Sequence, residues 1–123
     1  MKYLCLVYGD EHGFHDHPDH PPDAECHAYD VHVAESGRSV AAEALQPTRA
    51  ATTLRVRGGE VQLTDGPFAE TKEQLMGFYL IDVRDLNEAL RVAAGIPAAR
   101  VGSVEVRPVR ELETGSPSGG PDR

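Results

Sequence analysis

The sequence predicts a single α+β domain on the ferredoxin-like βαββαβ plan, with an added hairpin. Apolar runs with strand character alternate with two helical segments in that order along the chain. The runs at residues 2–8 and 75–83 carry apolar side chains on both faces, as expected for strands that are covered on both sides. Gly58 and Gly59 separate two further short runs and are typical of a hairpin turn.

A loop is expected between the first strand and the first helix. Its prolines exclude a helix from residues 9–23, because each removes a backbone donor and clashes with the preceding turn. A helix is then expected over residues 23–36, since Gly37 is a usual residue after a helix end. Its buried face carries three residues at helical spacing: Cys26, Tyr29 and Val33.

Strand and helix signals of the same kinds predict the remaining elements. Strands are expected at residues 39–45, 51–57, 60–64, 75–83 and 103–109. Asp85 is the predicted cap of the second helix, with Glu88 reaching back to it, and Gly95 ends that helix. The buried stripe of this helix is expected to contain Leu86, Ala89, Leu90 and Ala93.

One domain is the expected organisation of a chain of 123 residues and 13.3 kDa. We assign it residues 1–110, including a His- and Pro-rich acidic loop at residues 11–23, and expect a disordered tail at residues 111–123. Cys5 and Cys26 are too few for a disulfide scaffold and are expected to be unreactive core residues. No run is apolar and long enough for a membrane span or a signal peptide, so a cytoplasmic location is expected.

Negative charge is concentrated in one segment of the chain. The net charge is -8, and residues 10–36 contain all six histidines but no Lys or Arg. Binding to nucleic acid or to an anionic membrane surface requires a basic face. Neither nucleic acid nor a membrane is therefore expected as a direct partner.

Both helices of this plan pack on one face of the sheet, which leaves an apolar face bare. A bare apolar face on a small protein usually marks an interface. We therefore predict a homodimer in which the two sheets face each other.

Residues 65–75 have the sequence DGPFAETKEQL, which closely resembles the signature of the DGPF branch of the YCII-related proteins. Shorter segments support the resemblance at residues 1–3, 8–10, 43–47, 52–57, 79–83, 96–100 and 103–109. Together the resemblance covers residues 1–10 and about 37–109.

The resemblance implies a dimeric α+β barrel, in agreement with the plan above. It also implies two kinds of function. The wider group is thought to include enzymes in which a His–Asp pair lines a cleft, whereas the DGPF branch is often found beside or fused to sigma factors. Members usually carry two glycines after Gln-Leu, whereas this chain has Met76 followed by Gly77, and it also departs from the family in its histidine-rich region 11–32.

Asp65 is the first candidate for a catalytic residue. It ends a strand before a Gly-Pro turn, with Phe68 close by to exclude water, and such a carboxylate can act as a general acid or base. The alternative is that Asp65 caps its own turn. The resemblance makes His27 the matching candidate acid, at a similar distance before Gly37 as the family's histidine; the alternative is a helix-flank histidine without a partner.

Five residues are candidates for contacts to a substrate: Tyr8, Arg55, Phe68, Glu70 and Lys72. Lys72 or Arg55 would bind a carboxylate. The alternatives are that Tyr8 fills the core or an interface and that Lys72 is a solvated surface charge. Residues 71–74 also fit a capping box for a short helical turn.

Four histidines form the pattern H-x-x-H-x-H-x-x-H: His12, His15, His17 and His20. Imidazoles at this density can bind zinc, nickel or copper. A true site also needs contacts that fix each ligand, and prolines interrupt this segment. We therefore expect neither a resident metal nor an organic cofactor.

Two functions remain open at this point. The first is a small dimeric enzyme-like protein that performs cofactor-free isomerisation or elimination on a small polar or carboxylated molecule, in a cleft beside residues 65–68. The second is a non-catalytic binding or regulatory dimer that acts beside a sigma factor. A ligand-sized cavity that contains Asp65 favours the enzyme, and a filled turn region favours the binding module.

Overall fold

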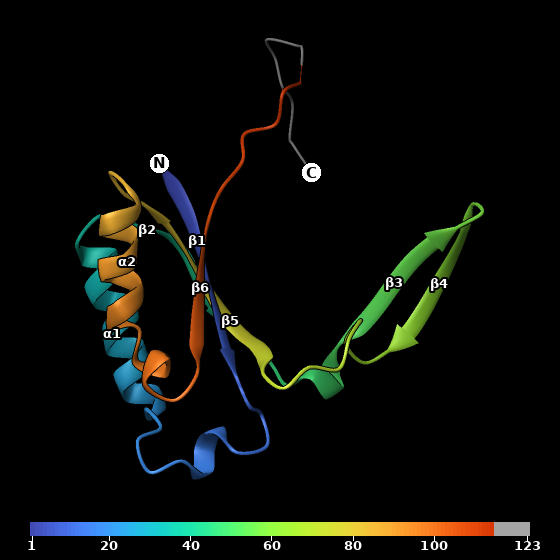
Figure 1. Cartoon of the computed structure of the whole chain (residues 1–123), viewed down its shortest axis with the longest axis horizontal. Helices are drawn as coiled ribbons and strands as arrows, with labels where there is room; N and C mark the ends of the chain where they lie inside the picture. Colours follow the sequence, from blue (N-terminus) through green and yellow to red (C-terminus); the bar gives the residue numbers. More distant parts are fainter. Residues whose placement is uncertain (115–123) are drawn as a thin grey trace.

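The computed structural model describes residues 1–114 and contains a layer of helices on a layer of strands, from which a hairpin extends (Figure 1). Residues 115–123, most of the predicted tail, lie outside the described part, and residues 111–114 form no helix or strand. The sheet contains β1 (Lys2–Gly9), β2 (Ser39–Ala44), β5 (Gln74–Asp82) and β6 (Ser103–Pro108). Their order is β2-β5-β1-β6, and every neighbouring pair is antiparallel. This topology confirms the predicted α+β class and is consistent with a ferredoxin-like fold.

Two helices cover one face of the sheet (Figure 1). They are α1 (Asp23–Glu35) and α2 (Leu86–Gly95), and three short 3₁₀ turns join the elements: η1 (Phe14–Asp16), η2 (Thr48–Ala50) and η3 (Pro97–Arg100). Cys5 and Ile81 of the central strands are fully buried, together with Val33 of α1. Leu4 and Leu6, which alternate with these side chains, are only half-buried. Within residues 1–114 the helices cover one face of the sheet, as expected, and coverage of the other face of β1 stays a prediction.

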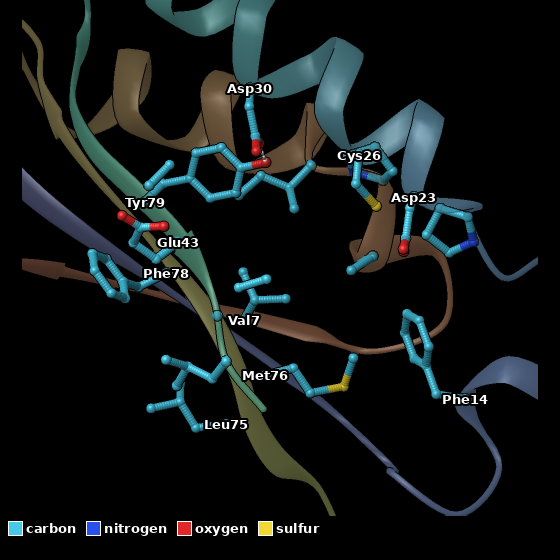
Figure 2. A pocket seen from close by; sticks show the side chains of 18 of the residues that line it. Val7, Phe14, Asp23, Cys26, Asp30, Glu43, Leu75, Met76, Phe78 and Tyr79 are labelled. Carbon is cyan, nitrogen blue, oxygen red and sulfur yellow. Dashed lines mark hydrogen bonds between the residues drawn. The ribbon is translucent and has the colours of Figure 1, made fainter. Parts of the chain in front are cut away.

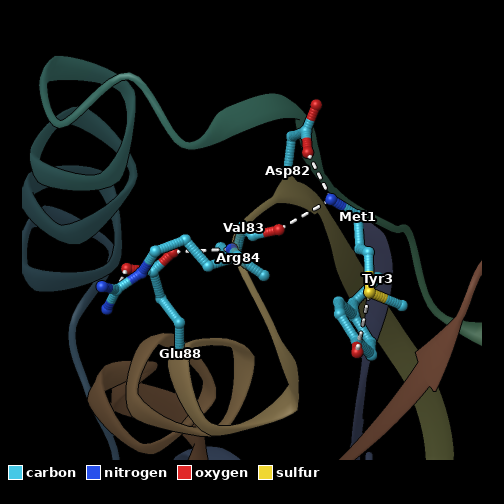
Figure 3. A network of polar contacts seen from close by, with 6 residues as sticks. All are labelled: Met1, Tyr3, Asp82, Val83, Arg84 and Glu88. Carbon is cyan, nitrogen blue, oxygen red and sulfur yellow. Dashed lines mark hydrogen bonds and ion pairs between the residues drawn. The ribbon is translucent and has the colours of Figure 1, made fainter.

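The start of α2 is held by the predicted cap. The backbone N–H of Glu88 donates to Asp85 Oδ1 at 2.9 Å. The Glu88 carboxylate accepts from the backbone N–H of Arg84 at 3.0 Å, and Figure 3 draws this second bond. The same figure shows the Met1 amino nitrogen donating to the Val83 carbonyl at 2.7 Å. These bonds tie the first residue of the chain to the segment between β5 and α2.

The predicted buried stripe of α2 is only half right. Ala89 and Ala93 are buried as expected, but Leu86 and Leu90 are each 47% exposed. Val92, which the prediction omitted, is buried instead. The Tyr29 hydroxyl of α1 donates to the Val92 carbonyl at 2.6 Å, so α2 turns its Val92 side toward α1.

The hairpin consists of β3 (Thr52–Arg57) and β4 (Glu60–Asp65) and forms a sheet of its own. Gly58 and Gly59 have φ of 57° and 78°, the left-handed values that a tight turn of this kind requires. Leu54 lies opposite Leu63, and the next pair on the same face is Val56 with Val61. All four side chains are more than half exposed. Figure 1 shows the hairpin projecting on the side of the sheet opposite the helices.

The segment between the hairpin and β5 forms no helical turn. The Thr71 hydroxyl donates to the Glu73 carbonyl, and the Gln74 side-chain amide donates to the Thr71 carbonyl at 2.6 Å. Gln74 is already the first residue of β5. The predicted capping box is therefore wrong, because these side chains bond the backbone of an extended segment.

Among the described residues, no helix has the length and apolar character that a membrane crossing requires.

Candidate functional site

A cavity of about 300 Å³ lies between α1, the loop that follows β1, and the β2–β5 edge of the sheet (Figure 2). The apolar part of its lining includes Val7, Phe14, Pro21, Ala42, Leu75, Met76, Phe78, Ile96 and Ala98. The polar part includes Glu11, His15, Asp23, Cys26, Asp30, Glu43, Gln46 and Tyr79. Figure 2 shows Cys26 and Asp30 extending from α1 toward Val7 and Met76 on the sheet.

Gly77 allows β2 and β5 to meet at the edge of this cavity. A Cβ atom at this position would lie 2.8 Å from the backbone oxygen of Glu43, closer than real Cβ contacts. The neighbouring Met76 places its side chain in the cavity wall. The departure from the family pattern at Met76 therefore lies in the cavity wall.

Tyr79 and Asp30 form a hydrogen-bonded pair in the cavity wall. The Tyr79 hydroxyl donates to Asp30 Oδ1 (Figure 2). Tyr79 is only 7% exposed and Asp30 is half-buried. Burial, followed by the hydrogen bond to Asp30, raises the pKa of the Tyr79 hydroxyl far above its ordinary value. Tyr79 is therefore a neutral hydrogen-bond donor at physiological pH, and Asp30 is its acceptor.

The Cys26 thiol faces the same cavity (Figure 2). Burial raises its pKa, and so do the negative charges of Asp23, Asp30 and Glu25. The thiolate is the nucleophilic form of cysteine, so this environment keeps Cys26 unreactive at neutral pH. Cys5 is fully buried, and burial raises its pKa to about 11. Neither thiol is activated, as the sequence predicts.

The loop between β1 and α1 is the outer wall of the cavity, and several contacts hold it. Phe14 is buried, and both Glu11 carboxylate oxygens accept hydrogen bonds from Thr48, at 2.6 Å from its backbone N–H and 2.7 Å from its hydroxyl. Near α1, the Arg100 guanidinium donates to Glu25 Oε1 at 2.9 Å and to the backbone carbonyl of Asp19. The hydrogen bond from Arg100 lowers the pKa of Glu25. The acidic loop thus forms a structured wall around the cavity.

None of the seven residues predicted to act on or bind a substrate lines this cavity. They are Asp65, His27, Tyr8, Arg55, Phe68, Glu70 and Lys72. Tyr8 is half-buried on the outer face of β1, and the other six are exposed. His27 belongs to α1, whereas Asp65 belongs to the hairpin on the opposite side of the sheet, so the chain does not bring this His–Asp pair together (Figure 1).

Asp65 does not cap its turn either. Among the described residues its side chain makes no hydrogen bond, and the turn is held by neighbouring groups. The Gly66 backbone N–H donates to the Ala51 carbonyl at 2.8 Å, and the Thr53 hydroxyl donates to the Gly66 carbonyl at 2.8 Å. The carboxylate of Asp65 is therefore exposed at the base of the hairpin.

The histidine-rich loop does not form a metal-binding cluster within residues 1–114. That part of the chain contains no group of three or more His, Cys, Asp or Glu side chains placed to hold an ion. The His15 and His20 rings meet edge to face, with centroids 5.8 Å apart, while His17 Nδ1 accepts from the Asp19 backbone N–H at 3.1 Å. His15 alone of this group lines the cavity.

Sequence reasoning missed Asp30 and Tyr79, although signals for both were present. Asp30 follows Cys26 by four residues, so a helix places the two side chains on one face. Tyr79 lies on the same face of its strand as the predicted core residue Ile81. A carboxylate on the buried face of a helix, opposite a tyrosine on the buried face of a strand, indicates a pair of this kind.

Comparison with known proteins gives a family over the whole described chain. The YCII-related domain matches residues 1–113. An uncharacterized protein from Rhizobium meliloti (strain 1021) is 42% identical over 120 residues, which covers 94% of this chain and 97% of the relative. The match includes the sheet, the helices, the cavity lining and the hairpin. The extent of the domain match, together with this identity, shows that the chain belongs to the YCII-related family.

Proposed function

We propose that this protein binds a small organic molecule in the cavity between α1 and the sheet, and that it moves a proton of that molecule without an organic cofactor. The observation that carries the proposal is the Tyr79–Asp30 pair, which joins a carboxylate to a buried hydroxyl in the wall of a ligand-sized cavity. Pockets that bind small molecules are mostly apolar with a few fixed polar groups, and this one has that character.

Asp30 is the proposed base. Its Oδ1 is held by the Tyr79 hydroxyl, so Oδ2 is the oxygen that takes a proton from the ligand. In an isomerisation, Asp30 returns that proton to a different atom of the ligand. In an elimination, the electron pair left by the proton forms a double bond, and a leaving group departs with its own pair. Tyr79 orients the carboxylate, while Phe14 and Met76 shield the cavity from water.

The pair predicted from the sequence, Asp65 with His27, is a different proposal for the same chemistry. Both side chains are exposed and belong to elements on opposite sides of the sheet. Lys72 and Arg55 do not line the cavity, so they would serve as anion partners only outside it. We therefore place the reaction in the cavity and use Asp65 as the control.

Deuterium exchange tests this proposal. The protein is incubated in deuterium oxide with a panel of small ketones, aldehydes and lactones, some carrying amino groups, and label in the recovered compound is measured by mass spectrometry. Asp30→Asn should lower exchange on a responsive compound by about 100-fold, the usual contribution of a general base. Tyr79→Phe should lower it less, because the carboxylate remains.

Asp65→Asn is the matched control, with the same change of charge at the base of the hairpin. It should leave the exchange rate unchanged. Loss of exchange in Asp65→Asn but not in Asp30→Asn would move the reaction to the hairpin base and refute the cavity proposal.

The exposed hairpin supports a second proposal, which is that two copies of the chain form a homodimer. Its exposed apolar face (Leu54, Val56, Val61 and Leu63) and the half-buried outer face of the central sheet are two apolar surfaces on one chain. An isolated two-stranded hairpin is marginally stable in water. We propose that a second copy covers these surfaces in a homodimer whose sheets face each other. The regulatory alternative, a dimer acting beside a sigma factor, relies on the same exposed surfaces.

Sedimentation velocity tests the dimer. Leu54→Ser with Leu63→Ser should raise the dimer dissociation constant by roughly tenfold or more, because apolar contacts are lost. Arg55→Ser with Gln62→Ser, the neighbouring cross-strand pair on the polar face, is the control and should have little effect. A wild-type protein that sediments as a monomer at every concentration would refute the homodimer.

A further inference from the structure

The charged side chains that line the cavity are carboxylates. Four carboxylates line it, from Glu11, Asp23, Asp30 and Glu43, whereas no Lys or Arg of the described chain does. Arg100 is the cation beside this region, and it is already paired with Glu25 and with the carbonyl of Asp19. An anionic ligand would therefore meet repulsion without a compensating cation.

The four carboxylates differ in what already satisfies them. Both oxygens of Glu11 accept hydrogen bonds from Thr48, and Glu43 is exposed on β2 at the cavity edge. Asp30 has only Tyr79, a neutral donor that binds Oδ1. Within residues 1–114 its Oδ2 accepts no hydrogen bond. A half-buried carboxylate with a neutral partner retains its full negative charge, which favours a cation beside it.

Asp23 adds to the charge along the same wall of the cavity. It precedes Cys26 by three residues and Asp30 follows Cys26 by four, so both carboxylates lie on the Cys26 side of α1. Burial raises the pKa of the Cys26 thiol most, and the negative charges of Asp23 and Asp30 raise it further. The opposite wall, with Val7, Met76 and Ile96, is apolar. The cavity therefore has one negatively charged wall and one apolar wall.

We propose that the ligand of this cavity is an amine, whose ammonium group lies near the Asp30 carboxylate while Oδ2 stays free to take a proton from the ligand. Its small apolar body lies on Val7 and Met76. This inference rests on the proposed function of the cavity and adds the class of ligand to it. A volume of about 300 Å³ is at the lower limit for ligand pockets, so the apolar body is about the size of one aromatic ring. The carboxylated ligand expected from the sequence carries the wrong charge for this site.

Three probes of similar shape test the class of ligand: benzylamine, benzyl alcohol and benzoate. Each is titrated into the ¹⁵N-labelled wild-type protein, and the amide signals of Cys26, Asp30 and Met76 report binding in the cavity. Benzylamine should bind at least tenfold more tightly than benzyl alcohol, and benzoate should bind most weakly. Added salt should reduce the preference for benzylamine only partly, because Asp30 is half-buried.

Asp30→Asn should remove the preference of benzylamine over benzyl alcohol while leaving the affinity for benzyl alcohol nearly unchanged. Asp16→Asn is the matched control, since it removes the same charge from an exposed position in the same acidic segment. It should keep the preference. Equal losses in the two variants would show a general charge effect and overturn the role of Asp30.

The two proposals fail in different ways. Tighter binding of benzyl alcohol or benzoate at the cavity signals would overturn the amine and leave the cavity as a ligand site. No binding of any probe at these signals would overturn both the amine and the proposed cavity function. The wild-type comparison does not depend on how well any variant folds.

Discussion

The central strands and the hairpin have the same kind of sequence but opposite surroundings. Cys5 of β1 and Ile81 of β5 are 0% exposed, whereas Leu54 and Leu63 of the hairpin are 58% and 67% exposed. Both regions are paired antiparallel strands with apolar residues at every second position on the face that carries these side chains, although β1 and β5 are apolar on their other face as well. The comparison teaches that strand periodicity predicts which face is apolar, but not what covers that face.

The apolar faces of the two regions differ in exposure because the helices cover only the central strands. β1 and β5 lie under α1 and α2, which supply Val33, Ala89 and Val92 to the core. The hairpin lies on the other side of the sheet, where residues 1–114 provide no helix (Figure 1). The apolar face of the hairpin is therefore the place where a second chain would contribute most.

The largest effect should come from truncating the core of the sheet. Ile81→Ala should lower the free energy of unfolding by about 2 to 5 kcal/mol, because it leaves a cavity among packed side chains. Leu63→Ala should change it by less than about 0.5 kcal/mol in the monomer, since this side chain is already exposed. Urea denaturation over a series of protein concentrations measures both. A large cost for Leu63→Ala that grows with protein concentration would show that the hairpin face is covered in solution.

A second effect should appear at alkaline pH. Burial raises the pKa of Cys5 from its ordinary value of 9.0 to about 11, so the folded protein holds this proton more tightly than the unfolded chain does. The stabilisation is complete below pH 9 and is lost as the pH rises through 11, up to about 2 to 3 kcal/mol. Urea denaturation across this range, under reducing conditions, should show the fall. Cys5→Ala should show a shallower fall, and an unchanged slope would contradict the burial argument.

The smallest effects are expected at Asp65 and Asp85, the two aspartates that the sequence offers as caps. Asp85 accepts the hydrogen bond that begins α2, so Asp85→Ala should lower the free energy of unfolding by about 1 kcal/mol. Asp65→Ala should change it by less than about 0.5 kcal/mol, because the Asp65 side chain makes no hydrogen bond among the described residues. Thermal denaturation compares the two variants directly. A cost for Asp65→Ala that equals the cost for Asp85→Ala would indicate a turn contact in solution.

The elements of the fold could be predicted from local signals. Apolar runs predicted β1 and β5, the two glycines predicted the hairpin, and the Asp85 cap predicted the start of α2, each within one or two residues. The predictions were wrong where one local sequence pattern fits two different structures. Residues 71–74 fit a capping box, but the same side chains also bond an extended backbone. Leu86 and Leu90 fit an apolar stripe, but α1 lies against the Val92 side of α2.

The candidate site was harder to predict than the fold. The conspicuous segment in the sequence is residues 65–75, which drew attention to Asp65, and the structure leaves that residue exposed. The cavity instead combines Cys26 and Asp30 of a helix with Met76 and Tyr79 of a strand about fifty residues away. Only the pairing of β1 with β5, and the packing of α1 on both, brings these residues together.

Glu11 has a consequence that concerns both the cavity and the hairpin. Its carboxylate lines the cavity and at the same time accepts both hydrogen bonds from Thr48, in the η2 turn that leads into β3. A ligand that displaced this carboxylate would release the root of the hairpin together with the cavity wall. Glu11 therefore joins the cavity wall to the turn from which the hairpin starts.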